Sequence, residues 1–262
     1  MEPESHKLYH VHSFHSRNFL DTFFSSKPEM PFTYEGLRYP MEKFQNAFST
    51  GNFKGDMLID ISVGPIIHHL YEAQEYFRDI ILLKPTEHCI VEVKKWINSR
   101  TGAFDWSHAS TIATEVAGKS DQCEEKEIGL RKVITHVVKF DLNKENLTDP
   151  IGLPQADCLV LRSILEAISK DLDGFVRNLK RFSKLLKPGG NLMFYGVLNC
   201  TFYVVGGERF HAVKYNESDL RSMLSNEGYV ITQFEIFQRK SESDLIDFDS
   251  IVFCTAYKEQ KL

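Results

Sequence analysis

The hydrophobic pattern of the chain alternates between short apolar runs and longer amphipathic stretches. Apolar runs over 57–61, 79–83, 133–140, 157–161 and 191–198 predict buried strands of a largely parallel sheet. Stretches such as 89–97 and 175–186 carry apolar residues at helical spacing and predict helices between the strands. Strands that alternate with helices predict an α/β, doubly wound sheet.

The two ends of the chain follow other patterns. Residues 219–226 predict a last helix, and 229–237 with 251–257 predict an antiparallel hairpin that brings the sheet to seven strands. Residues 1–50 contain no strand-like run; Phe14, Phe19 and Phe23 recur at helical spacing, and 39–48 predict a second helix. The polar residues 118–127 predict a solvated surface segment. We therefore expect a single domain over 1–262, with a helical part at 1–50 and a core sheet at 51–262.

The turn that follows the first strand is the strongest local signal. Asp60 lies within that strand, and Ser62, Val63 and Gly64 form a tight turn after it. Pro65 suits the first position of a helix because its φ is fixed and it has no N–H to leave unpaired. A strand, a glycine turn and a helix N-terminus form the usual nucleotide-binding corner of an open α/β sheet. We therefore expect the ligand to lie across this turn.

Composition excludes several other classes of protein. The net charge of −5 and the pI near 6.1, without a basic block, argue against nucleic-acid binding. The five cysteines contain no C-x-x-C motif and are odd in number, so neither a zinc site nor a disulfide framework is indicated. We interpret the clustered histidines near the N-terminus as chance spacing and expect no metal. With no leader-like N-terminus and no apolar run of membrane-spanning length, we expect a cytoplasmic monomer without membrane contact.

Several motifs resemble the small-molecule N-methyltransferases, the family of nicotinamide, indolethylamine and phenylethanolamine N-methyltransferases. They are residues 55–61, the Gly64-Pro65 step and residues 102–107, within a resemblance that runs from about Arg17 to Tyr257. The Leu-Lys-Pro-Gly-Gly sequence at 186–190 is also familiar from this class. The resemblance implies a class I methyltransferase (Rossmann-like) fold with an N-terminal helical lid. It also implies S-adenosylmethionine as cofactor, if the chain is active, and a small amine or pyridine as substrate.

The resemblance also implies which residues line the site. The positions that correspond to cofactor-binding positions of the family are Asp60, Ser62, Gly64, Pro65, His68, Lys84, Cys89, Asp141, Leu142, Arg162 and Phe24. No residue is assigned with certainty to catalysis, and the candidates that face the substrate are Tyr203, Glu166 and Phe19.

The cofactor positions depart from the family pattern at both ends of the ligand. Ser62 replaces a turn glycine, and Lys84 replaces the aspartate that holds the ribose, although an ammonium donates hydrogen bonds and cannot accept them. Phe19 and Phe24 replace tyrosines of the lid, which keeps the rings and removes the hydroxyls. Two functions therefore stay open. The first is an S-adenosylmethionine-dependent N-methyltransferase. The alternative is a catalytically inactive relative that acts as a binding or regulatory protein, with a protein partner.

Overall fold

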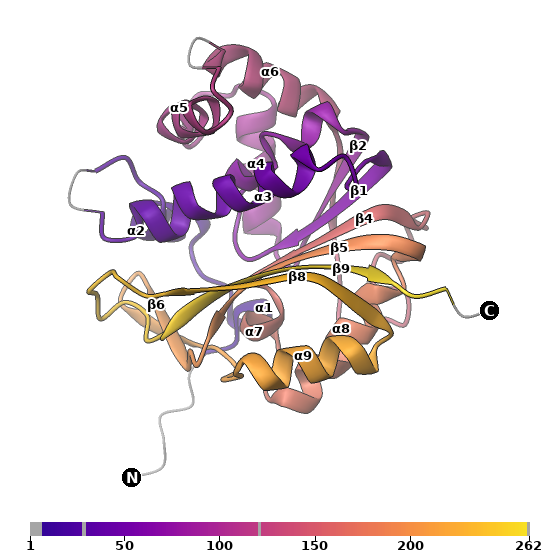
Figure 1. Cartoon of the computed structure of the whole chain (residues 1–262). Coiled ribbons are helices and arrows are strands. Elements are labelled where there is room, and N and C mark those ends of the chain that lie inside the picture. Colours follow the sequence, from indigo (N-terminus) through magenta and orange to yellow (C-terminus); the bar gives the residue numbers. More distant parts are fainter. Residues whose placement is uncertain (1–6, 28–29, 120–121, 261–262) are drawn as a thin grey trace.

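A seven-stranded mixed sheet runs through the molecule in the order β3-β2-β1-β4-β5-β9-β8 (Figure 1). The computed structural model describes residues 7–27, 30–119 and 122–260. The strands are β1 (Gly55–Ser62), β2 (Phe77–Lys84), β3 (Ile134–Lys139), β4 (Ala156–Arg162), β5 (Leu186–Leu198), β8 (Tyr229–Gln238) and β9 (Ser250–Lys258). The first five are parallel, whereas β9 is antiparallel to both β5 and β8. The predicted doubly wound sheet with a C-terminal antiparallel hairpin is confirmed.

Helices cover both faces of this sheet. They are α1 (Tyr9–His12), α2 (Ser16–Phe23), α3 (Tyr39–Ser49), α4 (Glu87–Ile97), α5 (Ser107–Val116), α6 (Cys123–Val133), α7 (Leu165–Ile168), α8 (Leu172–Ser183) and α9 (Glu217–Asn226). In Figure 1, α3, α5 and α6 lie above the sheet, and α7, α8 and α9 lie below it. Side chains cap three of these helices at their N-termini, where backbone N–H groups lack partners: Thr86 for α4, Asp171 for α8 and Asn216 for α9.

Some elements differ from the pattern-based expectation. The solvated segment expected at 118–127 is wrong from Cys123 onward, because α6 begins there and its Lys126 is buried in ion pairs with Glu72 and Glu75. The helix α5 was not expected. A second sheet of β6 (Phe202–Val205) and β7 (Glu208–His211) was also missed; the left-handed pair Gly206-Gly207 joins its strands.

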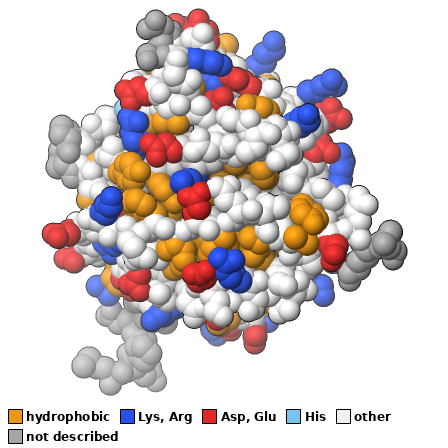
Figure 2. All heavy atoms as spheres, viewed as in Figure 1, with side chains coloured by type: hydrophobic (Ala, Val, Ile, Leu, Met, Phe, Trp, Pro, Cys, Tyr) orange, Lys and Arg blue, Asp and Glu red, His pale blue; other side chains and the backbone are white. Residues whose placement is uncertain are grey.

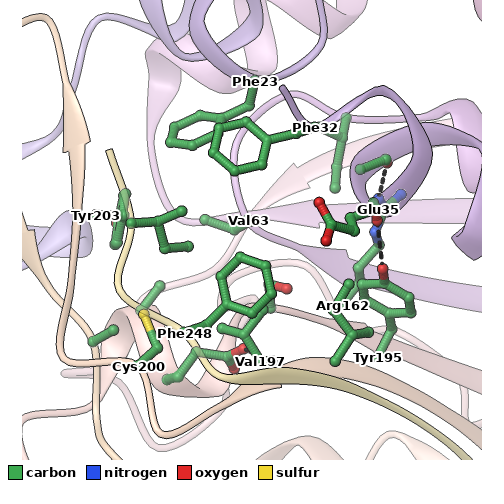
Figure 3. A pocket seen from close by; sticks show the side chains of 18 of the residues that line it. Phe23, Phe32, Glu35, Val63, Arg162, Tyr195, Val197, Cys200, Tyr203 and Phe248 are labelled. Atoms are coloured by element: carbon green, nitrogen blue, oxygen red, sulfur yellow. Dashed lines mark hydrogen bonds between the residues drawn. The ribbon is translucent and has the colours of Figure 1, made fainter. Parts of the chain in front are cut away.

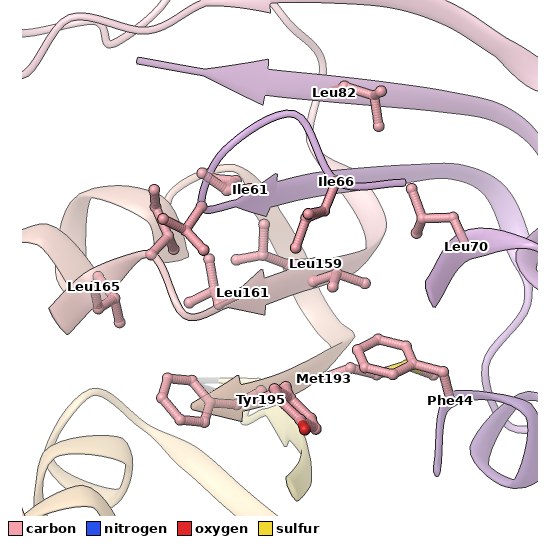
Figure 4. Packing of buried hydrophobic residues seen from close by; sticks show 14 of the residues in the cluster. Phe44, Ile61, Ile66, Leu70, Leu82, Leu159, Leu161, Leu165, Met193 and Tyr195 are labelled. Atoms are coloured by element: carbon pink, nitrogen blue, oxygen red, sulfur yellow. The ribbon is translucent and has the colours of Figure 1, made fainter. Parts of the chain in front are cut away.

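The central strands hold the most buried part of the core. Leu58, Ile59 and Ile61 of β1 are fully buried, as are Leu159 and Leu161 of β4. Figure 4 shows Ile61, Leu159 and Leu161 near Ile66, which follows the turn, and Leu165 of α7. Each buried aliphatic side chain contributes about 1.5–3 kcal/mol relative to exposure to water. The turn that follows β1 is therefore anchored to the best-packed part of the molecule.

The N-terminal segment crosses the sheet at the carboxyl ends of the parallel strands. Lys7 pairs with the second sheet, because its N–H donates to Arg209 O at 3.2 Å and its carbonyl accepts from His211 N at 2.8 Å. Farther along, the ring of Phe44 in α3 packs against His69 and Phe253. The expected helices of residues 1–50 lie over the sheet, although residues 1–6 and 28–29 fall outside the described part of the chain.

The surface carries both signs of charge. On the face in Figure 2, acidic and basic side chains alternate and no large area of one sign is visible. None of the helices in the described ranges combines the length and the hydropathy that a membrane span requires.

Candidate functional site

The turn after β1 lies at the centre of the sheet, between the carboxyl ends of β2 and β4. This is the crevice in which open α/β sheets bind ligands. Gly64 has a φ of +63°, and a Cβ built there would lie 2.4 Å from the ring of Phe19. Glycine is therefore required both by the left-handed backbone and by the lid residue that packs on it.

The helix expected to begin at Pro65 is absent. The chain instead forms two short 3₁₀ turns, His68–Leu70 and Ala73–Glu75. A helix N-terminus binds anions through several aligned N–H groups, and short 3₁₀ turns do not present that arrangement. The expectation of a helix at this corner is wrong, and the corner lacks the usual anion-binding element.

A buried polar cluster lies directly under the turn. The Lys84 ammonium donates to Ser62 Oγ at 2.5 Å and lies 3.6 Å from Asp60 Oδ2. His69 Nε2 lies 2.7 Å from Asp60 Oδ1, and Ser62 Oγ donates to Asp60 Oδ2. All four side chains are 0–1% exposed. The side chain at the end of β2 is therefore a donor and not an acceptor, and its ammonium is already bound by Ser62 and Asp60 of β1.

The protonation of this cluster follows from its burial. Burial lowers the pKa of His69 to about 4 although Asp60 opposes the shift, so the imidazole is neutral and donates a hydrogen bond. Burial alone would raise the pKa of Asp60, but His69 and Lys84 hold it below its usual value. Burial lowers the pKa of Lys84, an effect that Asp60 partly offsets. We assign a single ion pair, Asp60 with Lys84.

Side chains of the N-terminal segment fill the space above the turn. Tyr9 is fully buried; its hydroxyl accepts from Gly64 N at 3.2 Å and lies 3.0 Å from Cys89 Sγ. The ring of Phe14 stacks on Tyr9 at 4.4 Å and on Phe19 at 4.7 Å. These rings form a continuous stack from Cys89 to the glycine of the turn.

Arg162 lies at the end of β4, beside Ser62 in the strand register. Its Nη1 donates to His68 Nε2 and its Nη2 to Gly36 O, both at 2.8 Å, and its guanidinium lies over the ring of Tyr195. Burial lowers the pKa of Arg162 to about 10 and that of His68 well below its usual value, so arginine is the cation and histidine the neutral acceptor. No carboxylate in the described ranges forms an ion pair with this arginine.

A cavity of about 120 Å³ lies next to this arginine. Its walls are largely apolar, with Phe23, Phe32, Val63, Val197 and Phe248 around it (Figure 3). An engineered apolar cavity of about 150 Å³ in another protein binds benzene, which sets the scale. The cavity therefore suits one ring or a short chain.

Three charged residues line the cavity: Glu35, Arg162 and Glu166. The Glu35 carboxylate accepts from the backbone N–H groups of Lys240 and Ser241 at 2.7 and 3.0 Å. Glu166 Oε1 accepts from Val197 N at 3.3 Å, whereas its Oε2 has no partner among the described residues. Burial raises the pKa of Glu166 to about 7. The Tyr203 hydroxyl, also buried, is likewise without a partner in the described part of the chain.

The structure brings together most of the residues expected at the site. Asp60, Ser62, Gly64, Pro65, His68, Lys84, Cys89 and Arg162 surround the turn, and Phe19, Phe24, Glu166 and Tyr203 line the cavity. Asp141 and Leu142 are engaged in their own loop, where Asp141 Oδ1 accepts from Asn143 N and Leu142 O from Arg181. The role of all these residues in cofactor binding stays a prediction.

Sequence reasoning missed five residues of this region. They are Tyr9, Phe14, Glu35, Gly36 and His69. Four of them come from the N-terminal segment, whose path across the sheet no local pattern reveals. In the described ranges, no three histidine, cysteine, aspartate or glutamate side chains gather as a metal-ligand set.

Comparison with known proteins gives one consistent family. The model of the NNMT/PNMT/TEMT family matches residues 4–259. The chain is 31% identical to indolethylamine N-methyltransferase of Mus musculus, over 94% of this chain and 93% of that protein. It is 28% identical to nicotinamide N-methyltransferase of Homo sapiens, again over 94% and 93%. It is 34% identical to phenylethanolamine N-methyltransferase of Macaca mulatta, over 80% and 76%.

Solved structures agree on the fold. An S-adenosylmethionine-dependent methyltransferase from Clostridium acetobutylicum matches with a TM-score of 0.55 and 12% identity, over 87% of this chain and 96% of that one. The N-methyltransferase NodS from Bradyrhizobium japonicum, in complex with S-adenosyl-L-homocysteine, matches with a TM-score of 0.52 and 11% identity, over 94% and 100%. The fold is that of the class I methyltransferases, and the family uses S-adenosylmethionine.

In this arrangement the residues around the turn do not fit that cofactor. A ribose diol needs an acceptor at the end of β2, where Lys84 supplies a donor already engaged by Ser62 and Asp60. A ligand that approaches the turn backbone needs the space above Gly64, which Tyr9 and Phe19 fill. The misfit thus has two parts, one in the sheet and one in the lid.

The buried Asp60–Lys84 pair gives a stability prediction. Lys84→Met leaves Asp60 charged and unpaired, so we expect the free energy of unfolding to fall by about 3 kcal/mol in urea denaturation at neutral pH. Asp60→Asn combined with Lys84→Met removes both charges and should recover part of that loss. The control is Lys95→Met, since Lys95 forms a partly exposed pair with Glu92 and should cost less than about 1 kcal/mol. If Lys84→Met and Lys95→Met lowered the free energy of unfolding equally, the result would contradict a buried ion pair between Asp60 and Lys84.

The raised pKa of Glu166 gives a pH prediction. The unfolded chain ionises this residue above about pH 4.5, whereas the folded protein keeps the proton until about pH 7. Its contribution to the free energy of unfolding therefore falls between these values, by up to about 3 kcal/mol. Urea unfolding of the wild type and of Glu166→Gln at about pH 5 and about pH 7.5 isolates this contribution, because the glutamine does not titrate. Glu87→Gln, at an exposed glutamate, serves as control and should follow the wild type. Parallel pH profiles for wild type and Glu166→Gln would refute the assignment.

Proposed function

The chain belongs to the NNMT/PNMT/TEMT family, and from this premise we propose that it is a catalytically inactive member that binds a small molecule. The observation that carries the proposal is Lys84, fully buried and paired with Asp60 at the position where the cofactor needs an acceptor. Lys84 belongs to the sheet, so movement of the N-terminal segment does not remove it. The cavity next to Arg162 has the dimensions for a ring or a short chain.

The N-terminal segment supports the same proposal. The hydroxyl of Tyr9 accepts a hydrogen bond from the N–H of Gly64 and also contacts Cys89 Sγ. Further contacts hold the segment in place. Lys7 forms backbone hydrogen bonds with β7, and Arg17 forms an ion pair with Glu92. Displacement of the rings would expose Tyr9, Phe14 and Phe19 to water, at a cost of about 1.5–3 kcal/mol for each. A cofactor would have to offset that cost in addition to the loss of the ribose contact.

An inactive member of this kind would act as a binding or regulatory protein, with a protein partner that responds to the occupied cavity. Cys89, Cys158, Cys200 and Cys254 take part in no disulfide among the described residues. We infer from this a reducing, cytoplasmic environment and expect a monomer.

A second candidate, an active N-methyltransferase of a small amine or pyridine, is favoured by one observation. The cavity that contains the unpartnered oxygen of Glu166 also reaches Val63 of the turn. An amine bound in the cavity would therefore lie beside the turn, the place at which this chain's relatives are expected to bind the cofactor. Methyl transfer depends mainly on proximity and orientation, so this candidate depends on whether cofactor binding occurs at all.

Calorimetric titration with S-adenosylmethionine and S-adenosylhomocysteine tests the proposal. We expect no detectable heat for the wild type at millimolar ligand, and no shift in melting temperature, because the acceptor is missing and the rings fill the site. Human nicotinamide N-methyltransferase, treated identically, is the positive control. Micromolar binding by the wild type would overturn the proposal and favour the second candidate.

One double variant separates the contribution of the lid from that of the sheet. Tyr9→Ala with Phe14→Ala opens the lid and leaves Lys84 in place, so we expect it still not to bind. Recovery of micromolar binding in this double variant would assign the obstacle to the lid. Phe202→Ala, at an aromatic residue outside the stack, is the matched control.

A further inference from the structure

Three buried ionisable side chains line the cavity. Glu35 accepts two backbone N–H groups, whereas Arg162 and Glu166 have no oppositely charged partner among the described residues. Arg162 and Glu166 are each 2% exposed, and both line the cavity. They form no ion pair with each other or with another described residue. A buried charge without an opposite charge costs several kcal/mol, so Arg162 favours a ligand group with a negative charge. A ligand group with a positive charge would favour the ionised form of Glu166.

Among the described residues, only neutral groups contact the Arg162 guanidinium. Its partners are an imidazole nitrogen of His68, the carbonyl of Gly36 and the ring of Tyr195. A guanidinium has five N–H donors arranged in a planar fork, and the two hydrogen bonds leave donors available. A carboxylate matches this fork, because it accepts two parallel hydrogen bonds.

Glu166 offers the complementary group. Its Oε2 has no partner among the described residues, and the hydroxyl of Tyr203, another cavity residue, is also unsatisfied in the described chain. An ammonium group has three donors and would satisfy both oxygens. It would also supply the positive charge that an ionised Glu166 lacks.

The polar groups are spread around the cavity. Figure 3 shows Glu35, Arg162 and Tyr195 on one side, and Cys200 and Tyr203 on the other. Glu166 Oε1 accepts from Val197 N, and Val197 lies between these two sides. The space between them is bounded by the apolar side chains of Phe23, Phe32 and Phe248.

We propose that the cavity binds a small zwitterion, with its carboxylate on Arg162, its ammonium on Glu166 and Tyr203, and an apolar ring or chain between the two charges. The inference rests on the proposed ligand-binding function and names the chemistry of its ligand. It separates this chain from the relatives whose names describe neutral or singly charged amines, because the arginine adds a carboxylate site.

A matched set of three probes tests the ligand class. The probes are 4-(aminomethyl)benzoate, benzylamine and benzoate, which share a ring and differ only in their charged groups. By calorimetry we expect the zwitterion to bind at least about tenfold more tightly than either singly charged probe. A flexible set of 5-aminopentanoate, pentylamine and pentanoate removes the dependence on a fixed spacing. If neither set prefers its zwitterion, or if no probe binds, the proposal fails.

Variants assign each charge to its residue. Glu166→Gln, which keeps the side-chain shape, should reduce zwitterion affinity to that of benzoate and leave benzoate unchanged. Arg162→Met should reduce it to that of benzylamine and leave benzylamine unchanged, with Arg162→Lys intermediate. Arg78→Met, at an exposed arginine, is the control. If Arg162→Met does not fold, Arg162→Lys and Glu166→Gln decide. Equal loss for all three probes in Glu166→Gln would indicate a general structural effect and overturn the assignment.

The same titrations with and without S-adenosylhomocysteine separate this proposal from the proposed function. Zwitterion preference without any cofactor binding supports both. Zwitterion preference together with micromolar cofactor binding overturns the inactive assignment and leaves the zwitterion as substrate class. Absence of cofactor binding together with absence of zwitterion preference overturns the ligand class alone.

Discussion

The ion pair between Asp60 and Lys84 is the interaction on which the rest of the site depends. Both side chains are fully buried under the turn that ends β1, so each charge needs the other. Ser62 completes the arrangement by bonding to both of them. Lys84 at the end of β2 and Ser62 in the turn both differ from the family pattern, and they are hydrogen-bonded to each other. The two differences therefore belong to one hydrogen-bonded cluster.

The Asp60–Ser62–Lys84 cluster lies on one side of the turn after β1, and the N-terminal segment covers the other side. Tyr9 bonds to the N–H of Gly64, and the Phe14 and Phe19 rings continue the stack, so aromatic surface replaces the polar surface that a nucleotide would need. Phenylalanines at lid positions where relatives carry tyrosines suit this arrangement, because a buried hydroxyl without a partner costs free energy and a ring does not. The lid and the sheet therefore both place protein groups where a nucleotide would bind.

The cavity differs from the turn. In the described part of the chain, it contains an acidic side chain with an unpartnered oxygen and a buried arginine whose partners are all neutral. In the proposed function, protein groups fill the space above the turn, and polar groups of the adjacent cavity stay available to a ligand. Ligand binding would then be separated from methyl transfer, although Val63 and Arg162 belong to both the turn region and the cavity.

The sequence by itself determined the sheet, the C-terminal hairpin and the family, because apolar periodicity and the motifs around Asp60 and Gly64 are local signals. It also identified Lys84 as a donor where an acceptor is expected, since charge belongs to the residue type. It did not give the pairing of Lys84 with Asp60, the 3₁₀ turns after Pro65, or the position of Tyr9. Only the tertiary structure decided these, because each depends on contacts between segments that are distant in the chain. For the same reason the sequence placed Arg162 among the candidate site residues, whereas its neutral partners, His68 and the carbonyl of Gly36, became evident only in the structure.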